Sequence, residues 1–319
     1  MYPGVYTTMN IQARPYRDLA DLASMRYLVM VGRQATIPAS YMHPGYLDWA
    51  THYPPADQAI HHNLRVWEDA DVDPPTLVAW AIFAHNEGSF DLFVHPTLHG
   101  TPLHERIMDE YVAWAEARAR AVGLNKLWPF WAMDYDTVLI RLLQARGFVA
   151  GPVGLPAPLF ERTLDELPTI QLPEGFTVQG VRNREDGRLR AQATHGAFHP
   201  NDDWEAYAAE YARFMDSAVY DGARDLFVRS PDGHGASACT IWFDAVNGVG
   251  LFEPVGTHPD FQGRDLGKAV MAEGLRCMKA AGMRQAVVGF DPSNRSALAL
   301  YTSMGFRASS YFTFPQKEV

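Results

Sequence analysis

The 319-residue chain is poor in cysteine, with only Cys239 and Cys277, both in apolar segments. Two separated thiols exclude the disulfide framework of small secreted domains. No apolar run approaches the ~18 residues of a membrane helix. The first ten residues lack the basic and then apolar pattern of a secretion signal. These absences predict a cytoplasmic protein without a membrane partner.

Positive charge is also scarce, because 27 Lys and Arg face 37 Asp and Glu, for a net charge of -10. This balance argues against nucleic acid as a partner and favours a cationic or neutral small substrate. Hydrophobic residues make up 47% of the chain and aromatic residues 12%. At ~100–200 residues per domain, the chain is long enough for two domains, each with its own core.

The most informative stretch runs from residue 249 to residue 306. Residues 249–257 are apolar enough for a buried strand, residues 258–265 are turn-rich, and residues 266–281 have helical apolar spacing before Gly282. The first N–H groups of such a helix have no intrahelical acceptor and carry partial positive charge. A strand that turns through glycine into a helix therefore predicts a phosphate or pyrophosphate site.

Other ligand motifs do not fit. The run from Gly263 to Ala269 is one residue shorter than a P-loop, and Ala269 cannot ligate magnesium. No G-x-G-x-x-G occurs at the turn, so a dinucleotide fold is not indicated. His195 and His199 have the spacing of a metal pair, but no Glu follows His195 and Pro200 ends the helix, so no metal is expected.

Two motifs in this stretch resemble those of the GCN5-related N-acetyltransferase (GNAT) superfamily. The family's acyl-CoA turn, Q/R-x-x-G-x-G/A, is matched by Gln262-Gly263-Arg264-Asp265-Leu266-Gly267. Its second signature, N-x-x-A-x-x-L-Y-x-x-x-G-F, is matched from Asn294 to Phe306. The resemblance implies an α/β fold with a mixed, mostly antiparallel sheet flanked by helices. It also implies acetyl-CoA as cosubstrate, without a metal.

The resemblance further implies how acetyl-CoA would be held. The backbone of Val255 and Thr257 would pair with the pantetheine arm, and the Val255 N–H would polarise the thioester carbonyl. Asn294 would contact the cofactor arm. The remaining cofactor-binding residues form the turn and the helix start, and they are Gln262, Gly263, Arg264, Asp265, Leu266, Gly267 and Lys268.

Asp265 departs from the family pattern, because it replaces the first motif glycine. Its carboxylate repels a pyrophosphate, so we expect weakened binding. If the Asp265 side chain points to solvent and caps the helix, the backbone N–H cradle survives.

Two residues are candidates for proton transfer. Tyr301 stands where the family places the general acid that protonates the departing CoA thiolate. It also shares a helical face with Ala297, Leu300 and Met304, so a core aromatic is the structural alternative. Glu253 lies on the strand before the turn, where the family often keeps a glutamate, and could serve as general base. A rim carboxylate without a catalytic role is the alternative for Glu253.

The first half of the sequence resembles the second. Residues 90–96 and 139–148 have counterparts ~160 residues later, at 255–259 and 297–306, which indicates an internal duplication. At the equivalent turn the first copy has Pro102, which lacks an N–H, and His104 in place of the last glycine. Leu143 stands at the position of Tyr301. We therefore predict two tandem GNAT folds: a degenerate domain at 1–150, a proline-rich connector at 151–173 and an acetyl-CoA-binding domain at 174–319.

Three further expectations concern local structure. Residues 36–55 look like a loop-rich aromatic region, and residues 159–164 like the last strand of the first copy. Asp202, Asp203 and Trp204 lie in the loop by which the family usually admits its acceptor, and they could attract and stack a cationic amine. The aspartates are equally suited to capping a helix, and capping is the favoured alternative.

The sequence thus predicts an N-acetyltransferase that acts on a small-molecule amine through direct attack in the C-terminal domain. One alternative is a non-catalytic acyl-CoA-binding or regulatory protein, which Asp265 keeps open. Another is an aminoacyl transferase that uses aminoacyl-tRNA, against which the acidic composition argues. The sequence leaves a monomer and a homodimer equally open.

Overall fold

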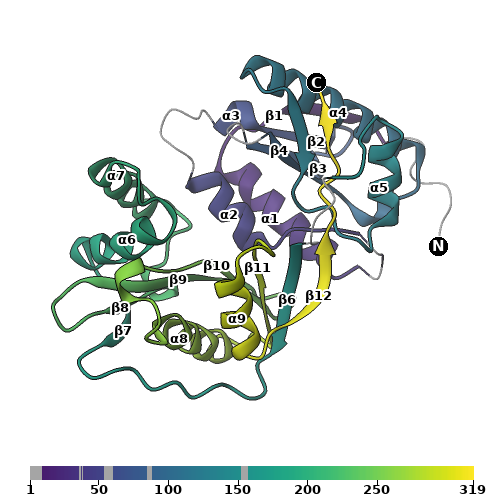
Figure 1. Cartoon of the computed structure of the whole chain (residues 1–319). Helices are drawn as coiled ribbons and strands as arrows, with labels where there is room; N and C mark the ends of the chain where they lie inside the picture. Colours follow the sequence, from purple (N-terminus) through teal and green to yellow (C-terminus); the bar gives the residue numbers. More distant parts are fainter. Residues whose placement is uncertain (1–8, 36, 38, 54–59, 85–87, 152–156) are drawn as a thin grey trace. The chain divides into compact units, whose positions relative to one another are not determined.

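The computed structural model describes residues 9–35, 37, 39–53, 60–84, 88–151 and 157–319 (Figure 1). The chain forms two compact units. The first comprises Met1–His43, Gln58–Ala157 and Ser310–Val319, and the second comprises Pro44–Asp57 and Pro158–Ser309. Each unit therefore takes segments from both halves of the sequence. None of the described helices is long and apolar enough to cross a membrane.

The first unit is built on a six-stranded sheet with the order β1-β2-β3-β4-β5-β13. The strands are β1 (Ile11–Pro15), β2 (Leu64–Asp69), β3 (Thr76–Ala84), β4 (Ser89–Val94), β5 (Lys126–Pro129) and β13 (Lys317–Glu318). Only β4 and β5 run parallel among these pairs; the others are antiparallel. The helices are α1 (Leu19–Arg33), α3 (Ile60–Asn63), α4 (Pro102–Ala121) and α5 (Thr137–Gln144), with a 3-10 turn, η1 (Pro96–Leu98).

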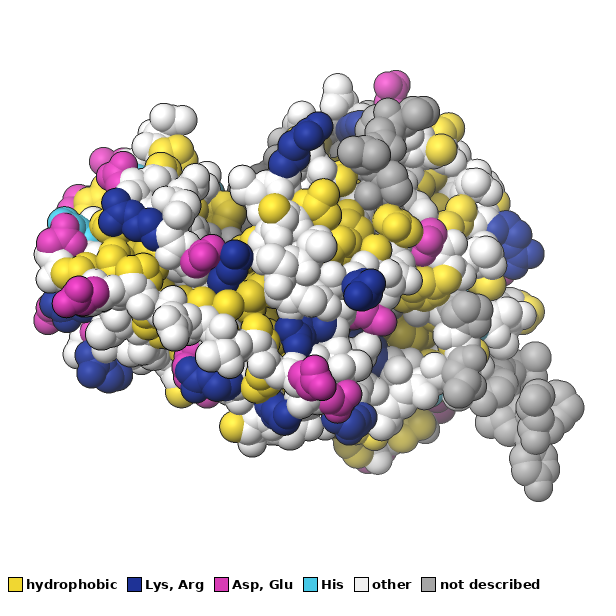
Figure 2. Space-filling view, turned by 60° about the horizontal axis from the view of Figure 1, so that its bottom comes forward, with side chains coloured by type: hydrophobic (Ala, Val, Ile, Leu, Met, Phe, Trp, Pro, Cys, Tyr) yellow, Lys and Arg dark blue, Asp and Glu magenta, His cyan; other side chains and the backbone are white. Residues whose placement is uncertain are grey.

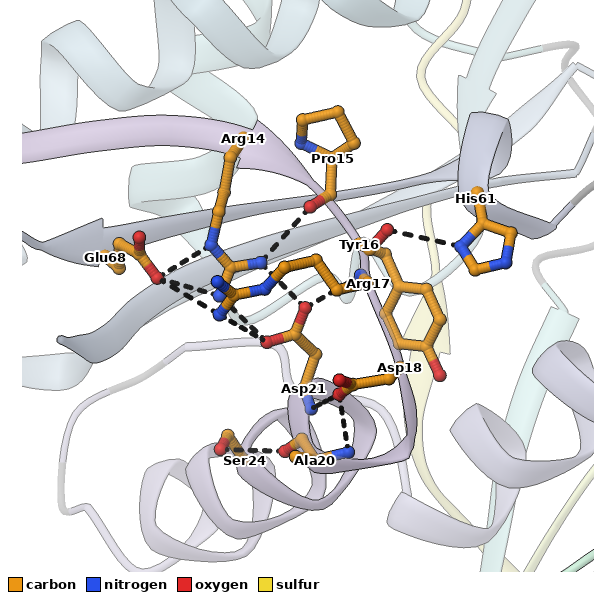
Figure 3. A network of polar contacts seen from close by, with 10 residues as sticks. All are labelled: Arg14, Pro15, Tyr16, Arg17, Asp18, Ala20, Asp21, Ser24, His61 and Glu68. Carbon is orange, nitrogen blue, oxygen red and sulfur yellow. Dashed lines mark hydrogen bonds and ion pairs between the residues drawn. The ribbon is translucent and has the colours of Figure 1, made fainter. Parts of the chain in front are cut away.

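A buried ionic network joins β1, α1 and β2 in this unit (Figure 3). Asp18 caps α1 by accepting the N–H groups of Ala20 and Asp21. The Arg14 guanidinium donates to Asp21 at 2.7 Å and to Glu68 at 2.7 Å. Burial opposes ionisation of Asp21, but hydrogen bonds from Arg14 lower its pKa below the ordinary value. Arg14 thereby fixes the start of α1 against the edge of the sheet.

The second unit is built on a seven-stranded sheet with the order β12-β6-β11-β10-β9-β8-β7. The strands are β6 (Ala157–Thr163), β7 (Thr177–Gly180), β8 (Asp225–Arg229), β9 (Gly235–Asp244), β10 (Val249–Thr257), β11 (Gln285–Gly289) and β12 (Arg307–Phe312). β10 and β11 run parallel, whereas β6–β11, β7–β8, β8–β9 and β9–β10 are antiparallel. The helices are α2 (Pro44–His52), α6 (Arg184–Phe198), α7 (Trp204–Met215), α8 (Leu266–Ala280) and α9 (Arg295–Ser303), with 3-10 turns η2 (Gly222–Arg224) and η3 (Pro259–Phe261).

Helices cover both faces of this second sheet, with α6 and α7 on one side and α8 on the other (Figure 1). Successive side chains of a strand point to opposite faces, so each strand supplies two cores. Ile241 and Phe252 pack with α8 residues. Their neighbours Trp242 and Leu251 pack with α6 and α7 residues. The predicted α/β class, with two mixed and mostly antiparallel sheets flanked by helices, is confirmed.

The internal repeat is visible in both units. β4 leads through η1 into α4, and β10 leads through η3 into α8. His95 and His258 begin the two 3-10 turns, and each side chain accepts the backbone N–H two residues further on. Gly100 and Gly263 then adopt the same left-handed backbone, with φ of 75° in both.

Two expectations about local structure were wrong. Residues 44–52 form helix α2, and α2 belongs to the second unit. The strand at 157–163 pairs with β11 of the second unit and not with the first sheet, while the C-terminal β13 pairs with β5 of the first. The placement of both segments has one physical reason: their partners in the second unit lie more than ~100 residues away in sequence, so no local pattern reveals which unit they join.

His104 makes the stability of the first unit depend on pH. It is 4% exposed, and its ring lies 4.5 Å from that of His99. Burial, and then the neighbouring His99 and Arg146, lower its pKa to about 4 from 6.5. Between these pH values the unfolded chain binds a proton that the folded chain excludes, so stability falls as pH falls. We expect this ring to account for a loss of roughly 2 to 3 kcal/mol between pH 7.5 and 4.5.

Urea unfolding at the two pH values measures this loss. His104→Leu should lose correspondingly less stability on acidification than the wild type, whereas His62→Gln, at an exposed histidine, should behave like the wild type. An unchanged pH dependence in His104→Leu would show that the folded chain accommodates the protonated ring.

Candidate active site

A cleft of about 640 Å³ lies in the second unit. It is lined by the end of β10, the turn that follows, the first residues of α8 and one side of α9. The end of α6 contributes Ala197 and Phe198. The predicted cofactor-binding residues other than Arg264 all line this cleft, and they are Val255, Thr257, Gln262, Gly263, Asp265, Leu266, Gly267, Lys268 and Asn294. Tyr301 lines it as well.

The cleft exists because two parallel strands separate. β10 and β11 pair from Val249–Leu251 opposite Gln285–Val287, and their pairing ends there although both strands continue. On the other edge of β10, the register against β9 shifts between Phe252 and Val255. This bulge contains Pro254, whose missing N–H is tolerated at such a break in the ladder. Beyond the bulge, Val255 pairs with Cys239 of β9 on one side. The other backbone edge of β10 at Val255 has no partner strand among those described and faces the cleft.

The start of α8 presents backbone donors without acceptors. The Ala269 N–H donates to the Asp265 carbonyl at 3.0 Å, as in a regular helix. Among the described residues, no acceptor takes a hydrogen bond from the N–H of Leu266, Gly267 or Lys268. These three groups also lie at the positive end of the helix dipole. The geometry therefore suits an anion with several oxygens, such as a pyrophosphate.

Asp265 does not cap helix α8. From the sequence alone, such a cap is the arrangement that would preserve the N–H cradle. The Asp265 side chain accepts no capping hydrogen bond, and its Oδ1 lies 2.8 Å from Lys268 Nζ. Its backbone is left-handed, with φ of 59°. Glycine adopts this conformation without steric cost, which is a physical reason for the glycine of the family motif. The carboxylate therefore strains the turn slightly and engages a lysine that faces the anion site.

Two other residues of the turn have distinct roles. Gln262 Nε2 donates to the Thr257 carbonyl at 3.2 Å, which fixes the turn against β10. Arg264 lies outside the cleft lining and faces a neighbouring groove, with its guanidinium 5.5 Å from the Phe261 ring centre.

Asn294 caps α9 by accepting the Ala297 N–H at 3.0 Å. Asn294 thus lines the cleft with its side-chain oxygen already engaged.

Tyr301 is both packed and at the cleft. It is 5% exposed, and its ring lies 5.2 Å from Phe290 and 6.2 Å from Phe306. Burial, and then the charge of Glu253, raise the pKa of the Tyr301 phenol well above its ordinary value. The phenol therefore keeps its proton at neutral pH.

Glu253 lies in the β10 bulge and is half-buried. Its backbone carbonyl accepts the indole N–H of Trp242 at 2.8 Å. Burial raises the pKa of the Glu253 carboxyl to about 7. A carboxyl with this pKa exchanges protons readily near neutral pH, which suits general-base work.

The three residues considered for acceptor binding do not line the cleft. Asp203 caps α7 by accepting the Ala206 N–H at 2.8 Å, as the favoured alternative predicted. Asp202 lies 3.0 Å from His199 Nδ1. The Arg188 guanidinium lies 4.9 Å from the Trp204 ring centre. Within the described residues, no group of three or more His, Cys, Asp or Glu side chains could hold a metal ion.

Sequence reasoning missed the contribution of α6. Phe198 ends this helix, lines the cleft and is 48% exposed, which is unusual for a large apolar side chain. An aromatic at the last position of a helix, before His199-Pro200, is the signal that could have indicated it. Trp242 was also missed, because nothing in an apolar strand distinguishes a hydrogen-bonding tryptophan from a packing one.

The equivalent turn of the first unit is closed by its own side chains. Pro102 has no N–H to offer, and the Thr101 hydroxyl accepts the His104 N–H at 3.3 Å. The Val94 carbonyl, at the end of β4, accepts the Tyr41 hydroxyl at 2.9 Å. The carbonyl of Thr257, the equivalent of Val94, likewise accepts a side chain, Gln262. The two units therefore differ in the donors at the helix start.

Diverging parallel strands, a glycine turn and an open helix start define the second unit as a GNAT fold. A sequence model of the Acetyltransferase (GNAT) family matches residues 191–306. The match covers the cleft-bearing part of the second unit, and the chain as a whole has a tandem GNAT architecture. A solved tandem GNAT protein from the clavulanic acid biosynthesis pathway has a TM-score of 0.68 with this chain at 14% identity, covering 97% of this chain and 98% of the other.

Within that class, the chain is similar to mycothiol acetyltransferases. It is 28% identical over 244 residues to the one from Thermobifida fusca, covering 68% of this chain and 71% of the relative. It is 28% identical over 173 residues to the one from Geodermatophilus obscurus, covering 52% and 56%. The chain spans about half the length of the first curated relatives it matches.

Substitutions at Asp265 should separate charge from backbone strain. Asp265→Asn removes the carboxylate charge but keeps a side chain that tolerates the left-handed region. Asp265→Gly removes both charge and strain, the strain being worth about 1 kcal/mol. We expect both variants to bind acetyl-CoA more tightly, by about five- to tenfold, in calorimetric titrations.

Only Asp265→Gly should also raise the midpoint of thermal unfolding without ligand. Equal affinity in the wild type and both variants would mean that the carboxylate turns away from the bound anion.

Proposed function

We propose that the chain is an N-acetyltransferase that moves an acetyl group from acetyl-CoA to an amine of a small-molecule acceptor, with its active site in the second unit. The observation that carries this proposal is the open N–H cradle at the start of α8, beside the strand edge exposed where β10 and β11 separate. At the equivalent helix start of the first unit, Pro102 lacks an N–H and the His104 N–H is taken by the Thr101 hydroxyl.

Acetyl-CoA fits the residues present. Its pyrophosphate matches the N–H groups of Leu266, Gly267 and Lys268. Its pantetheine arm carries amides that can pair with the free backbone edge of Val255 and Thr257, as an added strand does. The cleft volume of about 640 Å³ lies within the range of sites for molecules of this kind.

The side chains around the cleft supply the proton transfers. Glu253 accepts a proton from the acceptor ammonium, directly or through water, so that the free amine can attack the thioester carbonyl carbon. The Val255 N–H faces the negative charge that develops on the carbonyl oxygen. As the carbon–sulfur bond breaks, Tyr301 donates its proton to the thiolate. The nitrogen, which is positively charged after the attack, loses its second proton, and this proton restores the Tyr301 phenol. The products are an acetamide and free CoA.

The acceptor is proposed as a small molecule because the similar proteins are named mycothiol acetyltransferases. A tRNA-dependent aminoacyl transfer is less consistent with the surface. On the face drawn in Figure 2, Lys and Arg side chains alternate with Asp and Glu, without a continuous basic area among the described residues. A polynucleotide requires such an area.

A non-catalytic acyl-CoA sensor is the second candidate. The position of Asp265 favours it, because the carboxylate lies beside Lys268 at the anion site and weakens binding. A buried tyrosine that lines the cleft, and a carboxyl with a pKa of about 7 two residues before Val255 of the cleft lining, favour the enzyme.

Matched glycines of the two copies test the binding site. Gly100 and Gly263 both have φ of 75°, and a methyl group at either would meet nothing within 4 Å. Alanine should therefore cost each unit a similar stability, about 1 kcal/mol. We expect acetyl-CoA to bind one site per chain, about fivefold more weakly in Gly263→Ala and unchanged in Gly100→Ala. Two sites per chain, or a loss in Gly100→Ala, would contradict the proposal.

Removal of the Tyr301 hydroxyl tests the role of this residue as the general acid. Tyr301→Phe should lower kcat for release of free CoA by at least about a hundredfold across a panel of amines. Its affinity for acetyl-CoA should stay within about twofold of wild type, since the ring remains. Tyr27→Phe, at a tyrosine 63% exposed on α1, should retain full activity. A wild-type chain that binds acetyl-CoA but transfers to no amine would favour the sensor.

The pH dependence of the rate tests the base. Because burial raises the pKa of Glu253 to about 7, the carboxyl is protonated below that pH and cannot accept a proton. We expect kcat/KM to fall about tenfold per pH unit below this pKa. In Glu253→Gln the remaining rate should be low and lack this acid limb. An acid limb that persists in Glu253→Gln would assign it to another group.

A further inference from the structure

Helix α2 comes from the first half of the sequence but belongs to the second unit. It packs on β9 and β10, the strands that carry the bulge with Glu253. Apart from α2 and β6, the described helices and strands of the first half belong to the first unit. Helix α2 thus belongs to the first copy by sequence and to the second unit by structure, and its contacts there indicate its role.

Helix α2 contacts the rest of the second unit through aromatic side chains. Trp49 stacks on Tyr53 with ring centres 4.0 Å apart and an interplanar angle of 13°. The edge of Trp49 meets Phe214 of α7 at 5.2 Å and Trp242 of β9 at 6.4 Å, with angles of 78° and 68°. Edge-to-face contacts of this kind have defined geometry, so they hold the Trp242 ring in one orientation.

The orientation of Trp242 matters because its indole N–H has a specific acceptor. It donates at 2.8 Å to the carbonyl of Glu253. That carbonyl lies in the bulge, where the ladder between β9 and β10 is interrupted and a backbone acceptor lacks its regular partner. One indole thus replaces the missing ladder bond and fixes the peptide that carries the Glu253 side chain.

A polar chain holds α2 in register against the same helices. Tyr53 hydrogen-bonds to Tyr207 of α7, whose hydroxyl donates to Thr194 of α6 at 3.0 Å. Thr194 also accepts from Arg190 at 3.0 Å, and Arg190 forms a fully buried ion pair with Asp225 at 2.7 Å. Each of these partners is buried, so displacing α2 would leave polar groups unsatisfied.

We infer that Trp49 and Trp242 are positioning residues for Glu253, and that the first half of the chain acts in catalysis by supplying α2. Trp49 orients the Trp242 ring, the Trp242 N–H fixes the Glu253 carbonyl, and the bulge then holds the Glu253 side chain two residues before Val255 of the cleft lining. This inference rests on the proposed function, because it assigns its effect to the general base. Neither tryptophan is among the residues that line the cleft.

Three variants test this chain of contacts. Trp242→Phe keeps an aromatic ring but removes the N–H donor, Trp49→Ala removes the ring that orients it, and Trp49→Phe is the conservative exchange. We expect Trp242→Phe and Trp49→Ala to lower kcat about tenfold while the KM for acetyl-CoA stays within about twofold. The acid limb of the rate should move to lower pH by about half a unit, because a released carboxyl gains solvent. Trp49→Phe should recover most of kcat.

A measurement that needs no turnover keeps this inference separate from the proposed function. In chain labelled with ¹³C-glutamate, the Glu253 carboxyl signal is the one absent from Glu253→Gln. Its titration midpoint should fall in Trp242→Phe and in Trp49→Ala relative to the wild type. Trp114→Phe, in a tryptophan that packs on Phe83 of the first unit, should leave the midpoint and kcat unchanged.

The outcomes differ for the two proposals. If the wild type transfers acetyl to no amine, the proposed function fails, and the ¹³C midpoint alone decides the positioning role. If Trp242→Phe folds as judged by circular dichroism and keeps both the wild-type midpoint and kcat, the positioning role is overturned. An equal loss in Trp114→Phe would also overturn it, since the effect would then be general destabilisation.

Discussion

The separation of β10 from β11 is the constraint on which the second unit depends. Two parallel strands that pair over three residues and then part leave one backbone edge of β10 without a partner strand. In a closed sheet those N–H and C=O groups would be satisfied by the neighbouring strand. Here the edge opens onto the cleft, and the bulge at Glu253 and Pro254 turns β10 away on its other side. The anion cradle of α8 and the Tyr301 ring line the same cleft as that open edge, and Glu253 lies in the bulge two residues before Val255.

The two units show how little sequence change closes such a site. Both have the histidine-led 3-10 turn and a left-handed glycine before the helix. In the first unit a proline removes one donor and a threonine hydroxyl takes another. Each replacement is an ordinary stabilising interaction, and together they exchange a ligand site for a satisfied interior.

The first half nevertheless contributes to the second unit. β6 completes the sheet beside β11, α2 packs on β9 and β10, and the C-terminal β13 returns to pair with β5. Because these segments are exchanged, each unit needs residues from both halves of the sequence to complete its fold. This exchange gives a physical reason for retaining a copy whose own turn cannot hold an anion: its residues are part of the other unit's core.

The sequence by itself determined the features that depend on short spacing. These features follow from residues within ~20 positions of one another, because hydrogen bonds of turns and helix starts are local. They are the strand, the turn and the helix at 249–281, the equivalent turn with Pro102, and the position of Tyr301 on the face of α9 toward the cleft. Tertiary structure alone decided the membership of α2 and β6, the left-handed backbone of Asp265 with its Lys268 partner, and the bond from Trp242 to Glu253. Strand exchange depends on partners separated by more than ~100 residues, and local patterns contain no information about such pairing. The ionisation of Glu253 likewise depends on burial by elements that meet only in the folded unit.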